Sequence, residues 1–213
     1  MPQTSNSQRR RELRRAHERE AVLAAAARLF AQHGYNETGM NQIAEAVSFS
    51  VGKLYNLFEN KEDLFVSLVD DRMRRLIEVS ASACDPNASA MTRLRQRVHA
   101  ALRYFAEDPH FSKIFLHEYP ATADGLLLRA SDHHVQIVRE CLEDAMAAGE
   151  LPREDAQVLA TLVCAHANAL IDHAVLRTEP LDPAWMMAYL ERFLFAPLER
   201  DAGADWTERD TPV

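Results

Sequence analysis

The sequence predicts an all-α protein of about nine helices, and three observations carry this prediction. Apolar residues recur at positions i, i+3, i+4 and i+7 along almost the whole chain, which is the spacing of one helix face. The alternation of apolar and polar residues that is typical of strands is not found, and neither is a Gly-rich phosphate loop. Proline and glycine interrupt the helical pattern at short intervals, where helices end.

The first 33 residues predict an arm and a helix. Residues 1–19 form an arginine-rich arm or helix extension, with six arginines between Arg9 and Arg19. The arm can be an ordinary solvated extension. The helix that follows carries Val22, Leu23 and Phe30 on one side, and Gly34 stands where a helix C-cap would.

Three shorter patterns follow up to residue 66. Thr38 or Gly39 caps a helix of about two turns, and Ser50 caps a short helix from about 51 to 57. Asn60 caps the next helix, whose first turn holds Glu62 and Asp63, as the positive end of a helix prefers.

The rest of the chain predicts five more helices. We expect them at about residues 89–107, 110–117, 123–148, 153–178 and 183–199. We therefore expect residues 20–66 to form one helical domain, residues 67–200 a second, and residues 201–213 an acidic tail.

Composition limits the function. With 213 residues and 47% hydrophobic residues the chain can bury a sizeable core. Its continuous apolar runs are shorter than the ~20 residues of a membrane span, and its N-terminus lacks the pattern of a secretory signal. Three cysteines without a CxxC pair favour a reducing compartment. We expect a cytoplasmic protein with no membrane segment.

The net charge of −8 is unevenly distributed. Residues 1–75 hold 12 Lys and Arg against 10 Asp and Glu, whereas the remaining residues hold 12 against 22. This asymmetry indicates two parts with different tasks.

Two short helices joined by about three residues and packed on a third form a helix-turn-helix, whose second helix enters the DNA major groove. In residues 48–64, "SFSVGKLYNLFENKEDL", we expect Phe49, Leu54 and Phe58 to face inward and brace the short helix. Its polar face is then the working surface.

The segment "LAAAARLFAQHGYNETGMNQIAEAVSFSVGKLYNLFENKEDLF" resembles the tetracycline-repressor (TetR) family of bacterial regulators. The Leu-Phe, Gly-Tyr, Ile-Ala-Glu, Ser-x-Gly-x-Leu-Tyr-x-x-Phe and Lys-Glu-x-Leu elements stand at that family's spacings over about 45 residues. The resemblance implies a nine-helix homodimer. Residues 20–66 would be its helix-turn-helix DNA-binding head, and residues 67–200 a body that binds a small effector and forms the dimer. The resemblance also implies that the last two helices form the dimer interface.

Chemistry and resemblance together predict the DNA contacts. Thr38 and Ser50, at helix starts, can offer hydroxyl and backbone N–H groups to phosphates. Tyr55 and Lys61 are further phosphate contacts, although Tyr55 can also be a half-buried packing residue. The base-facing candidates are Val51, Gly52, Lys53 and Asn56, and Asn56 can equally be an ordinary solvent-exposed residue.

Two positions depart from the family pattern. Ser48 replaces the usual turn glycine, so either the turn differs slightly or Ser48 is mildly strained at positive φ. Lys53 stands where a small polar residue is common, and its long cation can reach a guanine edge or another phosphate.

The body predicts an apolar effector pocket between its middle helices, although most of the same residues would look alike if they only filled the core. The candidates are Phe105, Phe111, Phe115, Leu127, His134, Val138, Cys141, Leu162 and His166. Five histidines, His117, His133, His134, His166 and His173, show no tight ligand spacing, so we expect no metal and no cofactor.

The leading hypothesis is a homodimeric repressor that a small, mainly apolar effector releases from double-stranded operator DNA. The alternative is an architectural or nucleoid-associated DNA binder on the same fold, without a ligand. An enzyme is not indicated, because no nucleophile with an adjacent base, carboxylate pair or cofactor loop is visible.

Overall fold

The computed structural model describes residues 6–118, 126–177 and 179–200. Within these ranges every regular element is helical, and counting π-helical turns with the helices that they continue gives nine helices. The all-α prediction is therefore confirmed. The predicted acidic tail, residues 201–213, lies outside the described residues.

The chain divides into two compact units. The first comprises Met1–Arg74 and His110–Leu127, and the second comprises Arg75–Pro109 and Leu128–Val213. The first boundary between the units, after Arg74, falls inside one continuous helix, α4 (Lys61–Ser82), as does the expected domain boundary after residue 66.

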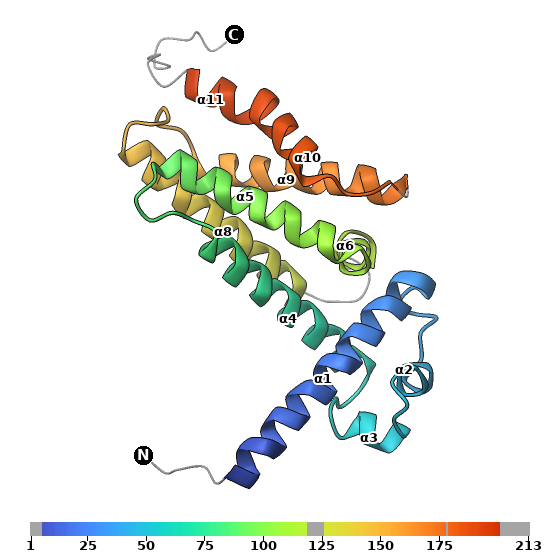
Figure 1. Cartoon of the computed structure of the whole chain (residues 1–213). Helices are drawn as coiled ribbons and strands as arrows, with labels where there is room; N and C mark the ends of the chain where they lie inside the picture. Colours follow the sequence, from blue (N-terminus) through green and yellow to red (C-terminus); the bar gives the residue numbers. More distant parts are fainter. Residues whose placement is uncertain (1–5, 119–125, 178, 201–213) are drawn as a thin grey trace. The chain divides into compact units, whose positions relative to one another are not determined.

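The first unit is built around α1 (Asn6–His33), on which α2 (Met40–Ala46) packs, with α3 (Val51–Tyr55) beside α2 (Figure 1). It also contains the start of α4, η1 (Ile114–Glu118) and α6 (Pro109–Lys113) except for its first residue. The expected arm is the first half of α1, with no break between them. Helix α1 ends at Gly34, whose φ of 84° suits a C-cap glycine.

Aromatic packing holds the first unit together. The Phe30 ring is fully buried and lies 5.5 Å from the centroids of both Tyr35 and Phe65. Such tilted and edge-on pairs add to the free energy gained by burying the rings. They join the end of α1 to the loop after it and to α4.

The second unit contains α5 (Ala90–Glu107), α8 (Leu126–Ala147) and α9 (Ala156–Leu176). It ends in one continuous helix formed by α10 (Pro183–Leu190), η2 (Glu191–Phe195) and α11 (Ala196–Arg200). Helix α10 packs on α5 and on α9. The caps are Ser89, Asp155 and Asp182, each of which accepts backbone N–H groups from the first turn that follows it.

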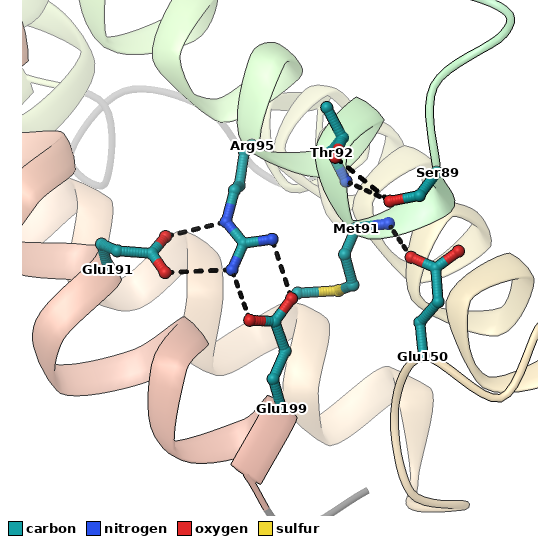
Figure 2. A network of polar contacts seen from close by, with 7 residues as sticks. All are labelled: Ser89, Met91, Thr92, Arg95, Glu150, Glu191 and Glu199. Carbon is teal, nitrogen blue, oxygen red and sulfur yellow. Dashed lines mark hydrogen bonds and ion pairs between the residues drawn. The ribbon is translucent and has the colours of Figure 1, made fainter.

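Charged side chains join the helices of this unit (Figure 2). The Arg95 guanidinium donates to Glu191 at 2.8 and 3.0 Å and to both carboxylate oxygens of Glu199 at 2.8 Å. Bonds to these two carboxylates raise the pKa of Arg95 still further. Glu150 accepts the backbone N–H groups of Ala90 and Met91 at 3.0 and 2.8 Å, which caps α5 from outside.

Helix α9 bears on the expectation that the chain has no membrane segment. Among the described residues it alone is long and apolar enough, by length and composition, to cross a membrane. Only 22% of its most apolar window is buried. The helix itself was expected at about residues 153–178. Counting continuous apolar runs did not reveal its high mean hydropathy, because polar residues interrupt the run: His166, Asn168, Asp172 and His173.

Candidate nucleic-acid interface

The turn between α2 and α3 is tight, and Ser48 has its backbone in the left-handed region, with a φ of 56°. No other non-glycine residue in the described part of the chain has a positive φ. The Phe49 N–H donates to the Ala44 carbonyl at 2.9 Å, which closes the turn. Of the two readings of Ser48, the structure shows the strained one.

Helix α3 has only five residues, and a free helix of that length is unstable in water. Its inner face is anchored in the core by Leu54 and Phe58, which are 0% and 1% exposed, as the sequence predicts. Ser50 caps it by accepting the Lys53 N–H at 3.2 Å. Burial of one face therefore stabilises the helix and leaves the other face available.

The outward face of α3 presents Val51, Gly52, Tyr55 and, at its C-cap, Asn56, all exposed. Tyr55 is 51% exposed, which favours the contact reading of this tyrosine over the packing one. At Gly52 an added Cβ would meet no atom within 4 Å. The fold itself thus has no steric need for glycine there.

Lys53 is less free than the sequence suggested. Its Nζ donates to Glu18 Oε1 at 2.8 Å and lies 3.6 Å from the centroid of the Phe49 ring. Its side chain is 35% exposed. Phe49, expected to brace the core, is half-buried and serves as a platform for this ammonium.

Thr38 has a structural role that the sequence analysis did not assign. The residue is 1% exposed, and its hydroxyl donates to the Gly34 carbonyl at 2.8 Å, with Leu29 O at 3.3 Å. Gly39 is the residue at the N-cap of α2. The hydroxyl is therefore engaged inside the protein, and a phosphate contact from Thr38 would have to come from its backbone.

Lys61, which the sequence analysis predicts as a phosphate contact, has bonding partners within the protein. Its Nζ donates to the carbonyls of Tyr35 and Asn36 at 2.9 and 3.3 Å and lies 4.3 Å from the Tyr35 ring centroid. These contacts offset the poor placement of a cation at a helix start. Asn60 Oδ1 accepts the Asp63 N–H at 2.8 Å, which confirms Asn60 as the cap.

The first half of α1 supplies residues that the sequence analysis missed. Arg15 and Arg19 donate to the carbonyls of Asn56 and Leu57, at 3.4 and 3.2 Å, where α3 ends. Glu18 accepts from Arg14 Nε at 3.1 Å as well as from Lys53, and these bonds lower the pKa of Glu18. The arginine-rich stretch was visible in the sequence, but its partners on α3 are 35 to 41 residues away.

A hollow of about 360 Å³ opens between α1 and α3. Its lining includes Arg11, Arg14, Arg15 and Lys53, with Glu18 as the acid. Several guanidinium groups around one hollow suit an anionic ligand such as a phosphate.

The candidate effector residues divide between the two units. Phe111, which is buried, and Phe115, which is half-buried, belong to the first. Phe105, Val138, Cys141 and His134 belong to the second, where Phe105 and Val138 are buried. Leu127 lies in α8, but its side chain is outside the described part.

Two of the effector candidates lie elsewhere than expected. Leu162 is 42% exposed, and His166, also exposed, has its Nδ1 2.7 Å from the Leu162 carbonyl within the same helix. Within α9 they belong to the exposed face, so an assignment to an internal pocket is not supported.

Cys141 lines a different cavity, of about 200 Å³, with Cys84, Arg93 and Arg97. Burial raises the pKa of the Cys141 thiol. Among the described residues no group of three or more His, Cys, Asp or Glu side chains is placed to hold a metal ion. The side chains of His117 and His133 lie outside that description.

Residues 22–68 match the sequence profile of bacterial regulatory proteins of the tetR family. The chain is 30% identical over 143 residues to the probable acrEF/envCD operon repressor of Escherichia coli (strain K12), a match covering 62% of this chain and 63% of the relative. It is 23% identical over 176 residues to the HTH-type transcriptional regulator YhgD of Bacillus subtilis (strain 168), covering 81% and 92%. The chain thus spans just under two thirds of the first relative's length.

Among solved structures, the transcriptional regulator FadR from Bacillus subtilis in complex with stearoyl-CoA aligns with a TM-score of 0.75. The alignment covers 81% of this chain and 95% of that one, at 20% sequence identity. At that identity the likeness shows the fold.

Proposed function

The chain belongs to the tetR family of bacterial regulatory proteins, and from this premise we propose that it is a homodimeric transcriptional repressor, released from its operator by a small-molecule effector. Its place of action is the bacterial cytoplasm, on chromosomal DNA. The observation that carries the proposal is α3, a helix buried on one face and exposed at Val51, Gly52 and Tyr55 on the other.

DNA contacts divide by chemistry. Val51, Gly52, Lys53 and Asn56 face base edges, while Tyr55 and the Ser50 hydroxyl donate to phosphates. Ser50 accepts a bond from Lys53 N, so its own O–H remains able to donate. Lys61 donates to the carbonyls of Tyr35 and Asn36, so a phosphate would have to compete with these two carbonyls for the ammonium.

The homodimer rests on the exposed apolar face of the last two helices. On α9 the exposed residues Val158, Leu162 and Leu176 follow helical spacing, with exposed Ala165 and Ala169 between them. On the last helix Trp185, Tyr189 and Phe193 are 41–52% exposed, and each ring contacts the next in a tilted arrangement, with centroids 5.6 and 4.5 Å apart. So many large apolar side chains on one surface indicate a protein partner.

A lipid partner for α9 is disfavoured by its polar residues. His166, Asn168, Asp172 and His173 lie within the same helix, and an ionisable group inside a bilayer costs several kcal/mol. A second copy of the same helix fits both the apolar and the polar residues of α9. Its small residues allow the two helices to approach closely, and its polar residues can hydrogen-bond between them.

The proposed effector is mainly apolar. The FadR structure contains stearoyl-CoA, whose acyl chain is apolar, and this ligand supports the class by analogy. The buried side chains of Phe105 and Val138 are the best-supported lining candidates in the second unit.

The test starts with selection of binding sites from a random duplex library by the purified protein. We expect an inverted repeat, with half-sites about 34–36 Å apart or near that spacing. Stearoyl-CoA is then titrated into the complex, with free coenzyme A as the control, and DNA release should require the acyl chain. If the protein binds every duplex equally and no acyl compound changes this, an architectural role is the better description.

A further inference from the structure

The arginine-rich first half of α1 is bonded to the end of α3. Arg15 donates to the Asn56 carbonyl at 3.4 Å. Arg19 donates to the Leu57 carbonyl at 3.2 Å, and its guanidinium lies 4.4 Å from the centroid of the Phe58 ring. These contacts give this part of α1 a defined place beside the helix that carries the proposed base contacts.

The side chains that α1 contributes to the hollow between α1 and α3 share one helix face. They stand at positions i, i+3, i+4 and i+7, and they are Arg11, Arg14, Arg15 and Glu18. Because an α-helix turns by about 100° per residue, the four side chains fall within a sector of about 100°. Arg9 lies about 160° from Arg11 around the same helix and therefore points away from the hollow.

The hollow is cationic. Its charged lining consists of four cations and one acid, which leaves a net charge of +3: Arg11, Arg14, Arg15, Lys53 and Glu18. Each guanidinium has five N–H donors, so the single bond from Arg14 to Glu18, or from Arg15 to a carbonyl, leaves donors for an anion. The Arg14 side chain is 80% exposed and accessible from solvent. The hollow can therefore accept a phosphate while its bonds to α3 persist.

The position of the hollow favours a phosphate that belongs to DNA. Lys53 and Asn56 line the hollow and are also among the residues proposed to face base edges. Each strand of a duplex carries one negative charge per 3.4 Å of helix axis, so every base that α3 contacts has phosphates close to it. A duplex whose major groove receives α3 thus brings its backbone within reach of the long arginine side chains.

We propose that the hollow between α1 and α3 binds a backbone phosphate of duplex DNA, next to the bases that α3 contacts. The inference rests on the proposed DNA-binding function and makes α1 a second DNA-binding element outside the helix-turn-helix. A guanidinium suits this task because its planar fork can bind a phosphate through two hydrogen bonds. Phosphates carry no sequence information, so the site strengthens binding to every duplex and fixes the orientation of the protein on it.

The experiment compares Arg11→Gln with Arg9→Gln. Both variants remove one positive charge from an exposed position of α1, and of the two residues Arg11 is the one that lines the hollow. Fluorescence anisotropy measures the Kd of each protein at several salt concentrations, for a duplex that the parent selects and for a shuffled duplex. Each lost phosphate contact lowers the slope of log Kd against log salt by about 0.9, so a dimer with two altered copies should lose about 1.8.

The two variants should also differ in affinity. Arg11→Gln should weaken binding to both duplexes by a similar factor, about fivefold to thirtyfold for two lost contacts. Arg9→Gln should stay within about twofold of the parent, because salt screens an exposed charge that makes no contact. Arg11→Lys keeps the charge but not the planar fork, so it should restore the salt slope and only part of the affinity.

The outcomes separate this inference from the proposed function. Equal salt slopes for Arg11→Gln and Arg9→Gln would overturn the inference and leave the proposed function in place. A loss of binding to the selected duplex alone would mean that Arg11 reads bases, which would overturn the phosphate assignment. If the parent binds every duplex equally, the proposed repressor fails, and the slopes still decide whether the hollow binds phosphate. A parent that binds no duplex would remove both.

A free anion is the remaining occupant to test. Calorimetry with inorganic phosphate measures whether the parent binds it and whether Arg11→Gln abolishes that binding. Such a loss, together with a DNA salt slope equal to that of the parent, would assign the hollow to a free anion and overturn the inference. Matching melting curves establish that the variants are folded.

Discussion

Gly52 allows a test that separates folding from the proposed DNA recognition. A Cβ there meets nothing within 4 Å, and alanine is a better helix former than glycine by up to about 1 kcal/mol. We predict that Gly52→Ala keeps or raises the free energy of unfolding but weakens DNA binding, because the added methyl separates α3 from the groove. Denaturant unfolding and a DNA titration test this, and unchanged DNA affinity would show that no close approach occurs.

At Ser48 the prediction concerns stability alone, and the substitution is to glycine. A left-handed backbone costs a residue with a side chain about 1–2 kcal/mol, and the greater freedom of unfolded glycine takes back about 0.4–1 kcal/mol. With φ at 56°, Ser48→Gly should therefore raise the free energy of unfolding by about 1 kcal/mol, the middle of a range from about 0 to 1.6 kcal/mol. Ser48→Ala keeps the strain and serves as the control. A loss of stability in Ser48→Gly would mean that the serine hydroxyl contributes more than the strain costs.

At the scale of elements, a helix that is capped by a carboxylate from another segment has a stability that depends on pH. Glu150 closes the N-terminus of α5, and its pKa lies below the ordinary 4.5, first because of the bond from Met91 N–H and also because of that from Ala90. A carboxyl whose pKa is lowered by folding stabilises the protein above its unfolded pKa. That contribution is lost as pH falls through the folded pKa.

We predict that Glu150→Gln lowers the free energy of unfolding at neutral pH and flattens the acid side of the stability curve. The gap between parent and variant should be full at pH 7 and shrink as pH falls below about 4.5. Denaturant titrations at several pH values measure this gap. A gap that stays constant down to the acid transition would remove Glu150 from the acid-sensitive groups.

For the whole molecule, the proposed dimer predicts that a charge on the exposed aromatic row, formed by Trp185, Tyr189 and Phe193, prevents dimer formation. Tyr189 is 41% exposed, so Tyr189→Glu disturbs the core of one chain little. Two copies facing one another would however bring the introduced charges into an apolar interface, where an unpaired charge is costly. Sedimentation should show a folded monomer, and binding to a two-half-site operator should weaken strongly.

Val79→Glu provides the matched control for the dimer. Val79 is 45% exposed on α4, outside the aromatic row, so this variant adds the same charge to another exposed apolar position. Its sedimentation and operator affinity should match the parent. If both variants stay dimeric, the proposed interface lies on another surface.

The sequence by itself determined the helices and most of their ends. Helical spacing of apolar residues, the caps Ser50 and Asn60, and the C-cap Gly34 depend on neighbours within a few residues, so a linear reading can find them. The buried side of α3 was predictable for the same reason, because Leu54 and Phe58 are four residues apart on one helix face.

Only the tertiary structure decided what the polar ends of these side chains contact. Lys53 binds Glu18, 35 residues away, and Lys61 binds the Tyr35 carbonyl, 26 residues away. A long flexible side chain can reach several acceptors, so the sequence does not show which acceptor it binds. Exposure of Leu162 and His166 likewise depends on which side of α9 the neighbouring helices cover. A helix period shows that a face exists, whereas packing in three dimensions determines which face is buried and which charges are paired.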